Sequence, residues 1–235
     1  MKPFINVHWK NLLVVNYRVD PAALGLLEDE LPVGTELDGF HGEHYVSVVA
    51  FQFQKTRILG IPMPFYRDFA EINLRFYVRR KVDGAWRRGV VFVKEIVPCR
   101  LPAMVANKIF KENFHIRALT CGSDDKTLNY QWIDGGELQQ LEIDRNTQLE
   151  TPAPGSLTEH IIDHYWAYKK INDTTTGEFQ VTHRAWQTHP CPAARIDLNI
   201  AQVYGQQWAN ALTPVSTFYA DGSQVQVTKP KKLRN

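Results

Sequence analysis

A run of polar side chains that could form a binding site alternates with apolar residues between Phe69 and Val78. The polar positions carry a carboxylate, an amide, a guanidinium and a phenol, at Glu71, Asn73, Arg75 and Tyr77. The positions between them are all apolar: Ile72, Leu74, Phe76 and Val78. Because successive side chains of a β-strand point to opposite faces, we expect the apolar set in the core and the polar set on the other face. That second face is either solvated or the wall of a pocket.

Glu71 and Arg75 supply the most specific chemistry of this set. An arginine can bind a carboxylate through two parallel hydrogen bonds, and a buried glutamate can act as a general acid or base. Their Cα atoms would lie roughly 13 Å apart on a strand, too far to pair but close enough to border one cavity. With Asn73 and Tyr77 as neutral hydrogen-bonding groups, the face would suit a small polar or anionic ligand. The alternative is a buried network in which Arg75 and a glutamate satisfy one another.

Other candidate groups lie outside this strand. Lys94 and Glu95 are adjacent in the next predicted strand, so only one of them can face inward. An inward Lys94 would be an amine nucleophile, and an ion pair at the cavity rim is the simpler role. His115 and His183 could border the cavity as ligand-binding or acid–base groups. Structural, hydrogen-bonded histidines are the alternative at both positions.

The spacing of histidines and cysteines does not predict a metal site. His160 and His164 lie four residues apart on a predicted helix, which is a spacing that can hold a metal ion. No glutamate base lies between them, so a solvated helix face is favoured. The three cysteines, Cys99, Cys121 and Cys191, are far apart and form no CxxC pair, so neither a zinc site nor a disulfide framework is expected. We expect no metal and no cofactor.

Turn residues between alternating segments predict a succession of antiparallel hairpins. The longest spans Phe69 to Arg100, because the pair Asp83-Gly84 at its centre favours a two-residue hairpin turn. Two more hairpins are expected at 128–133 with 138–143 and at 216–219 with 224–228. Helices are expected at 22–31, 102–112, 156–169 and 199–208, the third beginning with a capping box of Ser156 and Glu159. The predicted fold class is mainly β (α+β), with a few helices covering an antiparallel sheet.

Composition and charge narrow the function classes. The chain has 235 residues, of which 44% are hydrophobic and 22% charged, which suits one globular domain over 1–235. The net charge of +2 gives no basic surface of the kind that binds nucleic acid, so no nucleic-acid partner is expected. No apolar run approaches the roughly 20 residues of a membrane span, and no signal peptide is visible, so we expect a cytoplasmic protein that does not bind membranes. Exposed edge strands leave a homodimer open.

Several stretches resemble a known family when they are taken in order. The most specific are ELDGFHG at 36–42, EINLRFYV at 71–78 and GSLTEHIIDHYWAY at 155–168. Together with weaker matches they resemble the YqjF-like family of uncharacterised bacterial proteins, the domain of unknown function numbered 2071, over most of residues 8–228. The resemblance implies a fold similar to acetoacetate decarboxylase, an antiparallel sheet curled into a cone or barrel around a central cavity. It also implies that Glu71 is a cavity residue, and it is compatible with a dimer.

The same resemblance argues against the chemistry of that enzyme. Acetoacetate decarboxylase forms a Schiff base through a lysine whose pKa is lowered by a neighbouring lysine. The corresponding positions here carry Phe114 and His115, and neither can form an imine. Lys108 and Lys111 are close in sequence, and we expect them to be surface lysines. Schiff-base decarboxylation is therefore not expected.

Three functions remain open on the sequence alone, and they do not agree on whether the protein is an enzyme. The first is binding of a small organic ligand, anionic or of keto type, in the central cavity. The second is a lyase or hydrolase that uses Glu71 as acid or base and Arg75 as a substrate clamp. The third is a structural or interaction protein whose cavity is filled by its own side chains. A shared fold does not choose among them, because one fold can carry many functions.

Overall fold

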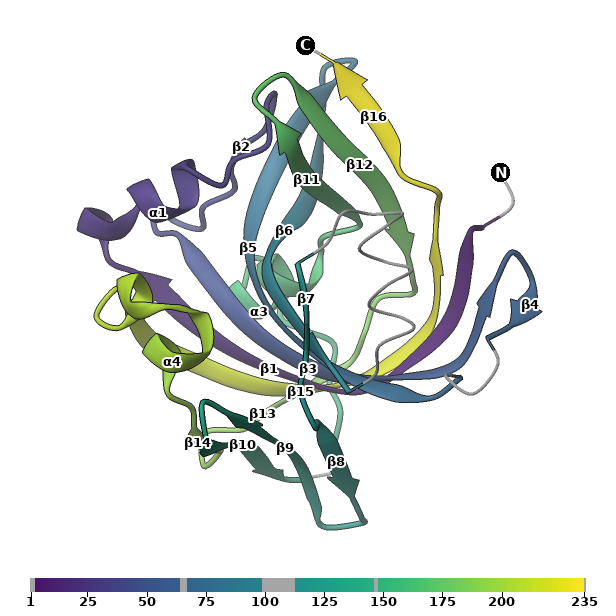
Figure 1. The fold of residues 1–235 in the computed structure, drawn as a ribbon, viewed down its shortest axis with the longest axis vertical. Coiled ribbons are helices and arrows are strands. Elements are labelled where there is room, and N and C mark those ends of the chain that lie inside the picture. The colour runs from purple at the N-terminus through teal and green to yellow at the C-terminus, as the bar shows by residue number, and fades with distance from the viewer. Residues whose placement is uncertain (1–2, 64–66, 99–112, 146–147, 235) are drawn as a thin grey trace.

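Strands dominate the computed structural model, which describes residues 3–63, 67–98, 113–145 and 148–234 (Figure 1). Within these ranges one large sheet has twelve strands. They are β1 (Ile5–Val19), β2 (Glu36–Leu37), β3 (Tyr45–Ile58), β4 (Ile61–Pro62), β5 (Phe69–Val82), β6 (Ala85–Val97), β7 (Phe114–Ile116), β11 (Trp166–Asn172), β12 (Thr175–Thr182), β13 (Thr188–Pro190), β15 (Leu212–Val227) and β16 (Lys231–Arg234). A smaller sheet contains β8 (Thr120–Ser123), β9 (Thr127–Asp134), β10 (Glu137–Asp144) and β14 (Arg195–Asp197).

The helices of the described ranges are short. They are the 3-10 helices η1 (Pro21–Ala23) and η2 (Gln206–Trp208) and the α-helices α1 (Gly25–Glu28), α3 (Leu157–Ile162) and α4 (Ile200–Tyr204). The helix predicted at 22–31 is divided into η1 and α1, and η1 begins at Pro21, because the Asp20 carboxylate accepts a hydrogen bond of 2.8 Å from the Ala22 backbone N–H. The helix predicted at 102–112 lies outside the described residues.

The large sheet curls until its two ends meet. Its main order is β13-β15-β1-β3-β5-β6-β11-β12-β16, and β12 pairs with β15 as well. That extra contact aligns Val181 with Val227 and Thr182 with Gln226. Most pairs are antiparallel, although β6 runs parallel to β7 and β11. Figure 1 shows the resulting cone-like shape, which confirms the predicted fold class.

β5 and β6 form the long hairpin that the sequence predicts. Asp83 and Gly84 have φ angles of 50° and 81°, and two successive positive values are what a two-residue turn of this kind requires. The pairing shifts by one residue between Leu74 and Arg75. Beyond this shift, in the part of the hairpin farther from the turn, Asn73 lies opposite Glu95. Their side chains therefore share one face of the sheet.

The apolar face of β5 is buried on the outside of the curled sheet. Its four side chains all have 0% exposure: Ile72, Leu74, Phe76 and Val78. They belong to a core that also contains Leu128, Tyr130 and Trp132 of β9 and Tyr204 of α4. The smaller sheet and α4 therefore cover the outer face, and the polar residues of β5 are left on the inner face, as the alternation predicts.

One predicted hairpin is a single strand in the structure. The sequence indicates two strands across Asp221-Gly222, but β15 runs through this pair without turning back. Gly222 has φ 77°, and a Cβ atom there would lie 2.2 Å from the carbonyl oxygen of Trp9. The glycine thus permits a close approach between β15 and β1 instead of a turn.

The predicted helix from Ser156 to Lys169 is also too long. α3 ends at Ile162, and the chain enters β11 at Trp166. Trp166 pairs with Gly89 of β6 and with Gln180 of β12. Pairing on both sides of β11 thus outweighs the helical pattern of the local sequence.

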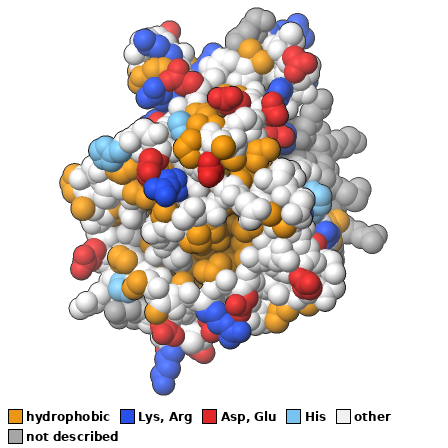
Figure 2. Space-filling model, turned by 90° about the vertical axis from the view of Figure 1, so that its left-hand side faces the viewer, with side chains coloured by type: hydrophobic (Ala, Val, Ile, Leu, Met, Phe, Trp, Pro, Cys, Tyr) orange, Lys and Arg blue, Asp and Glu red, His pale blue; other side chains and the backbone are white. Residues whose placement is uncertain are grey.

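The surface mixes apolar and charged groups. On the side where α1 and α4 lie in Figure 1, apolar side chains gather near the middle, and charged side chains of both signs surround them (Figure 2). Within the described ranges, no helix combines the length and the apolar character needed to cross a bilayer.

Candidate functional site

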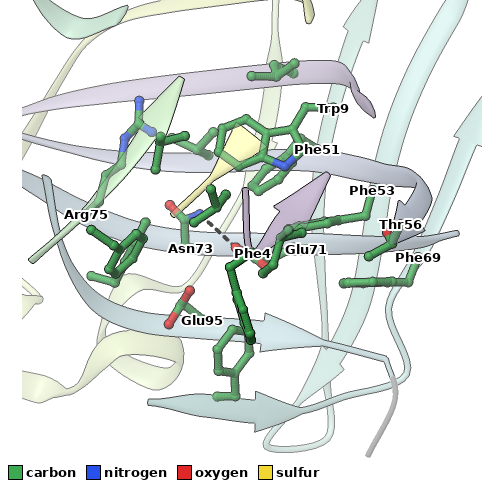
Figure 3. Close-up of a pocket in the computed structure, with 18 of the residues that line it drawn as sticks. Phe4, Trp9, Phe51, Phe53, Thr56, Phe69, Glu71, Asn73, Arg75 and Glu95 are labelled. Carbon is green, nitrogen blue, oxygen red and sulfur yellow. Dashed lines mark hydrogen bonds between the residues drawn. The ribbon is translucent and has the colours of Figure 1, made fainter. Parts of the chain in front are cut away.

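The inner face of the curled sheet borders a cavity of about 140 Å³ (Figure 3). Its lining comes from β1, β3, β5, β6, β7, β12 and β15 and is mostly apolar. Aromatic rings form much of it, including those of Phe4, Trp9, Phe51, Phe53, Phe69 and Phe92. The cavity is more apolar than the polar run on β5 suggests.

Four polar or charged residues line one part of this cavity. Glu71, Asn73 and Arg75 come from β5, and Glu95 comes from β6. The exposed fractions of Glu71, Asn73 and Glu95 are 4%, 2% and 4%. The Asn73 side-chain amide donates a hydrogen bond of 3.1 Å to Glu71 Oε1, which holds that carboxylate in place. The predicted set on β5 thus reaches the cavity at three of its four positions.

Arg75 is the member of this group whose polar atoms are least satisfied by the described residues. Its Nε is buried and has no hydrogen-bond partner among the described residues, and these residues provide no ion pair for its guanidinium either. The contact that does appear is with the ring of Tyr77, whose centroid lies 5.7 Å from the Arg75 Cζ. The alternative of an Arg75–glutamate pair is therefore not formed within the described part of the chain.

Tyr77, the fourth predicted residue, does not line the cavity. Its hydroxyl lies 2.6 Å from the Ser47 hydroxyl, which in turn donates to Asn16 Oδ1. Its ring centroid lies 4.7 Å from that of His164. Tyr77 therefore lies between Arg75, at one end of the cavity, and His164, which belongs to a second polar cluster described below. The role of Tyr77 in binding a ligand therefore stays a prediction.

The remaining candidates lie off the cavity lining. Lys94 donates to the Val203 carbonyl on the other face of the sheet, where burial lowers the pKa of its amine. His115 lies 3.0 Å from Asn113 Oδ1, and burial lowers its pKa. His183 stacks on Trp186 at 3.9 Å between ring centroids, which fits a structural role. Phe114, at the first of the positions compared with the catalytic lysines, does line the cavity. Lys108 and Lys111 lie outside the described residues.

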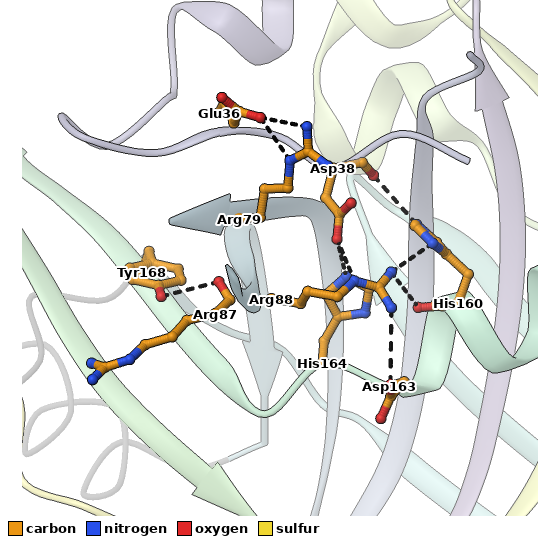
Figure 4. Close-up of polar contacts among 9 residues, drawn as sticks. All are labelled: Glu36, Asp38, Arg79, Arg87, Arg88, His160, Asp163, His164 and Tyr168. Atoms are coloured by element: carbon orange, nitrogen blue, oxygen red, sulfur yellow. Dashed lines mark hydrogen bonds and ion pairs between the residues drawn. The ribbon is translucent and has the colours of Figure 1, made fainter. Parts of the chain in front are cut away.

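A second polar cluster, formed by Asp38, Arg88, His160 and His164, was not predicted (Figure 4). Arg88 Nε donates to Asp38 Oδ2 at 2.6 Å, and another guanidinium nitrogen lies 2.5 Å from His160 Nδ1. His164 Nε2 lies 3.2 Å from the same Asp38 oxygen. The contacts tie together α3, the residue after β2, and β6. We refer to these four residues as the Asp38 cluster.

Burial and charge fix the protonation of the Asp38 cluster. Burial acts to raise the pKa of Asp38, but hydrogen bonds from His164 and Arg88 outweigh it and hold that pKa well below its usual value. Burial lowers the pKa of His164 to about 4, against the opposing hydrogen bond to Asp38. Burial and the neighbouring Arg88 also lower the pKa of His160. Near neutral pH the cluster therefore holds a carboxylate, a guanidinium and two neutral imidazoles.

The expectation of a solvated face for the two histidines is wrong. His160 and His164 have exposed fractions of 9% and 7% because α3 packs against the sheet and ends before His164. Potential ligand atoms of Asp38, His160 and His164 lie within 4.8 Å of one another, a spacing that could hold a metal ion. The guanidinium of Arg88 already donates to two of these three residues. The i, i+4 spacing was the sequence signal for this site, and the missing information was the position of Asp38.

The N-cap of α3 gives a direct test of how this helix is held. The Ser156 hydroxyl accepts a hydrogen bond of 3.2 Å from the Glu159 backbone N–H, and Glu159 reaches back to the Gly155 N–H at 2.7 Å. Replacing Ser156 with alanine should lower the free energy of unfolding by about 1 kcal/mol, because one N–H of the first turn loses its acceptor. Urea unfolding measures this. An unchanged midpoint would contradict the cap, and Ser156→Asp should retain stability.

Comparison with known proteins places the chain in a family. The model of DUF2071, an uncharacterized conserved protein, matches residues 6–224. The chain is also 30% identical over 103 residues to the uncharacterized protein YqjF of Bacillus subtilis (strain 168). That match covers 43% of this chain and 40% of YqjF, so it spans less than half of the relative's length.

Solved structures similar to this chain share its fold over nearly their whole lengths. An acetoacetate decarboxylase from Legionella pneumophila has a TM-score of 0.71 and 13% identity, covering 99% of this chain and 87% of that one. An acetoacetate decarboxylase-like enzyme from Sphingomonas wittichii RW1 has a TM-score of 0.61 and 14% identity, with coverages of 100% and 95%. The enduracididine biosynthesis enzyme MppR, complexed with a condensation product of pyruvate, has a TM-score of 0.64 and 14% identity, with coverages of 100% and 91%.

Identities of this size are evidence for the fold alone. The family match, in contrast, extends over nearly all of the sequence. The chain therefore belongs to the DUF2071 family and has an acetoacetate decarboxylase-like fold.

Proposed function

We propose that this protein binds a small organic ligand with an anionic or keto group in the cavity on the inner face of its curled sheet. The observation that carries the proposal is Arg75, which lines the cavity and whose buried Nε has no hydrogen-bond partner among the described residues. A buried donor without an acceptor is unfavourable, and a ligand oxygen would supply the acceptor. A carboxylate would fit best, because it can accept two parallel hydrogen bonds from one arginine.

Relatives of the same fold support a ligand of this kind. The enzyme MppR is described in complexes with pyruvate and with a condensation product of pyruvate. Pyruvate is a keto acid, which is the chemistry that Arg75 would recognise. The support is for the type of ligand, since 13–14% identity does not transfer a reaction.

The proposal includes binding without Schiff-base chemistry. Phe114 lines the cavity at a position compared with a catalytic lysine, and Lys94 points to the opposite face of the sheet. Treatment with acetoacetate and borohydride should therefore leave the mass of the protein unchanged. A stable adduct on any lysine, located by peptide mass spectrometry, would contradict this part of the proposal.

Arg75 can be tested by substitution. Arg75→Gln should weaken binding of a carboxylate ligand by about 10- to 30-fold, because a charge-assisted hydrogen bond contributes roughly 1.5–2 kcal/mol. Titration calorimetry with acetoacetate, pyruvate and phenylacetate measures the effect on whichever of them binds. Arg79→Gln is the matched control, since Arg79 lies on the same strand but pairs with Glu36 outside the cavity. Equal affinities for the two variants would exclude Arg75 as the anion-binding group.

A second candidate function is a lyase or hydrolase that acts on the same ligand. The observation that favours it is the carboxylate of Glu71, which borders the cavity and is oriented by Asn73. In this function Glu71 would serve as acid or base and Arg75 as the substrate clamp. Proton NMR of acetoacetate, pyruvate and phenylpyruvate incubated with the protein tests it. Turnover that Glu71→Gln abolishes, while ligand affinity is kept, would establish the enzyme.

A further inference from the structure

We infer that the ligand is a carboxylic acid carrying a single aromatic ring on a short linker, as in phenylacetate or phenylpyruvate. This inference rests on the proposed function and adds to it the chemical class of the ligand. Three features of the cavity support it: the aromatic character of the wall, the small volume, and the separation between the aromatic wall and Arg75.

Aromatic rings form much of the wall. Phe53 and Phe69 stack with a centroid distance of 4.5 Å and an interplanar angle of 9°. Phe51 lies 5.1 Å from Phe53, and Trp9 lies 4.8 Å from Phe51. These rings present both faces and edges, and aromatic pairs favour offset-stacked and edge-to-face contacts over this range of distances. A planar ring in the ligand would extend this cluster.

The volume limits how much apolar material can enter. The cavity measures about 140 Å³. An engineered apolar protein cavity of about 150 Å³ binds benzene, so one ring fits a space of this size. A second fused ring would have to extend toward the open side of the cavity. A two- or three-carbon acid has too little apolar surface to cover the aromatic wall.

The polar and apolar parts of the lining are separated in space. Figure 3 shows Arg75 at one side of the cavity and Phe53 and Phe69 at the other, with Asn73 and Glu71 between them. A ligand that satisfies both parts must place its carboxylate at Arg75 and its ring against Phe53 and Phe69. The ring and the carboxylate of such a ligand must therefore be separated by a linker.

Calorimetric titration with four probes tests the ligand class. Phenylacetate should bind at least about 30-fold more tightly than acetate, because burial of each ring carbon adds to affinity. It should also bind at least tenfold more tightly than 2-phenylethanol, which has the same ring but no charge. The expected difference is about the contribution of one charge-assisted hydrogen bond. 1-Naphthylacetate should bind more weakly than phenylacetate.

The outcomes separate this inference from the proposed function. If acetate, acetoacetate or pyruvate bind as tightly as phenylacetate, the aromatic class is wrong and binding of a small acid stands. If 1-naphthylacetate binds more tightly than phenylacetate, the single-ring limit is wrong. If none of these acids binds, both the inference and the proposed function fail.

A pair of matched variants locates the ring. Phe53→Ala should weaken phenylacetate by about tenfold and leave acetate nearly unchanged, because only the ring contact is lost. Phe40→Ala is the control, since Phe40 is a half-buried phenylalanine that packs on His160 and does not line the cavity. An equal loss of phenylacetate binding in both variants would overturn the assignment. Phe53→Leu serves where the alanine variant does not fold.

Discussion

Replacing Arg88 with methionine is expected to lower the free energy of unfolding by about 3 kcal/mol. Removing one partner of a buried ion pair typically costs about 3–5 kcal/mol, because the remaining charge stays buried without compensation. Asp38 is 5% exposed, and its oxygen receives the 2.6 Å hydrogen bond from Arg88. Arg88 itself is 27% exposed, which places the expected loss at the lower end of that range. Urea unfolding followed by circular dichroism measures it.

Two further variants make this expectation specific. Arg18→Met removes a comparable guanidinium from an exposed pair with Glu43 and should change stability by less than about 1 kcal/mol. The double variant Arg88→Met, Asp38→Asn should recover part of the loss, because no unpaired carboxylate remains. Equal losses for Arg88→Met and Arg18→Met would show that the Asp38 cluster does not stabilise the fold.

Stability should fall as the pH is lowered from 6.5 toward 4, and above about pH 5 most carboxylates still keep their charge. His164 in the folded protein has a pKa of about 4, against 6.5 for an ordinary histidine, and burial is the main cause. Between these two values the unfolded chain binds a proton that the folded chain resists, so acid favours unfolding. The difference corresponds to on the order of 3 kcal/mol, and His160 adds to it in the same direction. Asp38 contributes only at lower pH, because its own pKa is depressed.

The contribution of His164 can be isolated by comparing stability at pH 7 and pH 5. His164→Gln keeps a side-chain N–H for Asp38 but cannot be protonated in this range, so its stability should change less between these two pH values. His8→Gln replaces an exposed histidine and should keep the slope of the unaltered protein. A His164→Gln variant with the full pH dependence would assign the effect to other groups.

The inner and outer faces of β5 could be predicted from the sequence because the relevant rule is local. Alternation over eight residues places Ile72 and Leu74 in the core and Glu71 and Arg75 on the other face. The hairpin turn was also predictable, since Asp83-Gly84 has a backbone preference of its own. Whether the polar face would meet solvent or a cavity depended on the curl of the sheet, for which the resemblance to a known family was the only guide.

The elements that could not be predicted depend on partners far away in the chain. Trp166 joins a strand because Gly89 and Gln180 flank it, although its local sequence favours a helix. Gly222 looks like a turn residue and instead lets β15 pass close to Trp9. In both cases a tertiary contact overrides the preference of the local sequence.

The Asp38 cluster was missed for the same reason. Asp38 and His164 are separated by 126 positions in the chain and meet only after the sheet has curled. The sequence shows the spacing of His160 and His164, but it shows neither their burial nor the arrival of Arg88. The three stretches that carry most of the family resemblance contain Asp38, Tyr77 and His160, and these residues lie close together in the structure. Their shared presence in the family pattern was a second sequence signal for this cluster.

The two faces of β5 have different roles in the structure. One face is buried under the smaller sheet and α4, and the other lines the cavity. Substitutions at positions 71, 73 and 75 would therefore alter the lining of the cavity, whereas substitutions at positions 72, 74 and 76 would disturb the packed core. During evolution, residues on the inner face could therefore change one at a time. A shift of one residue in the pairing of β5, in contrast, would exchange its two faces and disrupt the core and the cavity lining together.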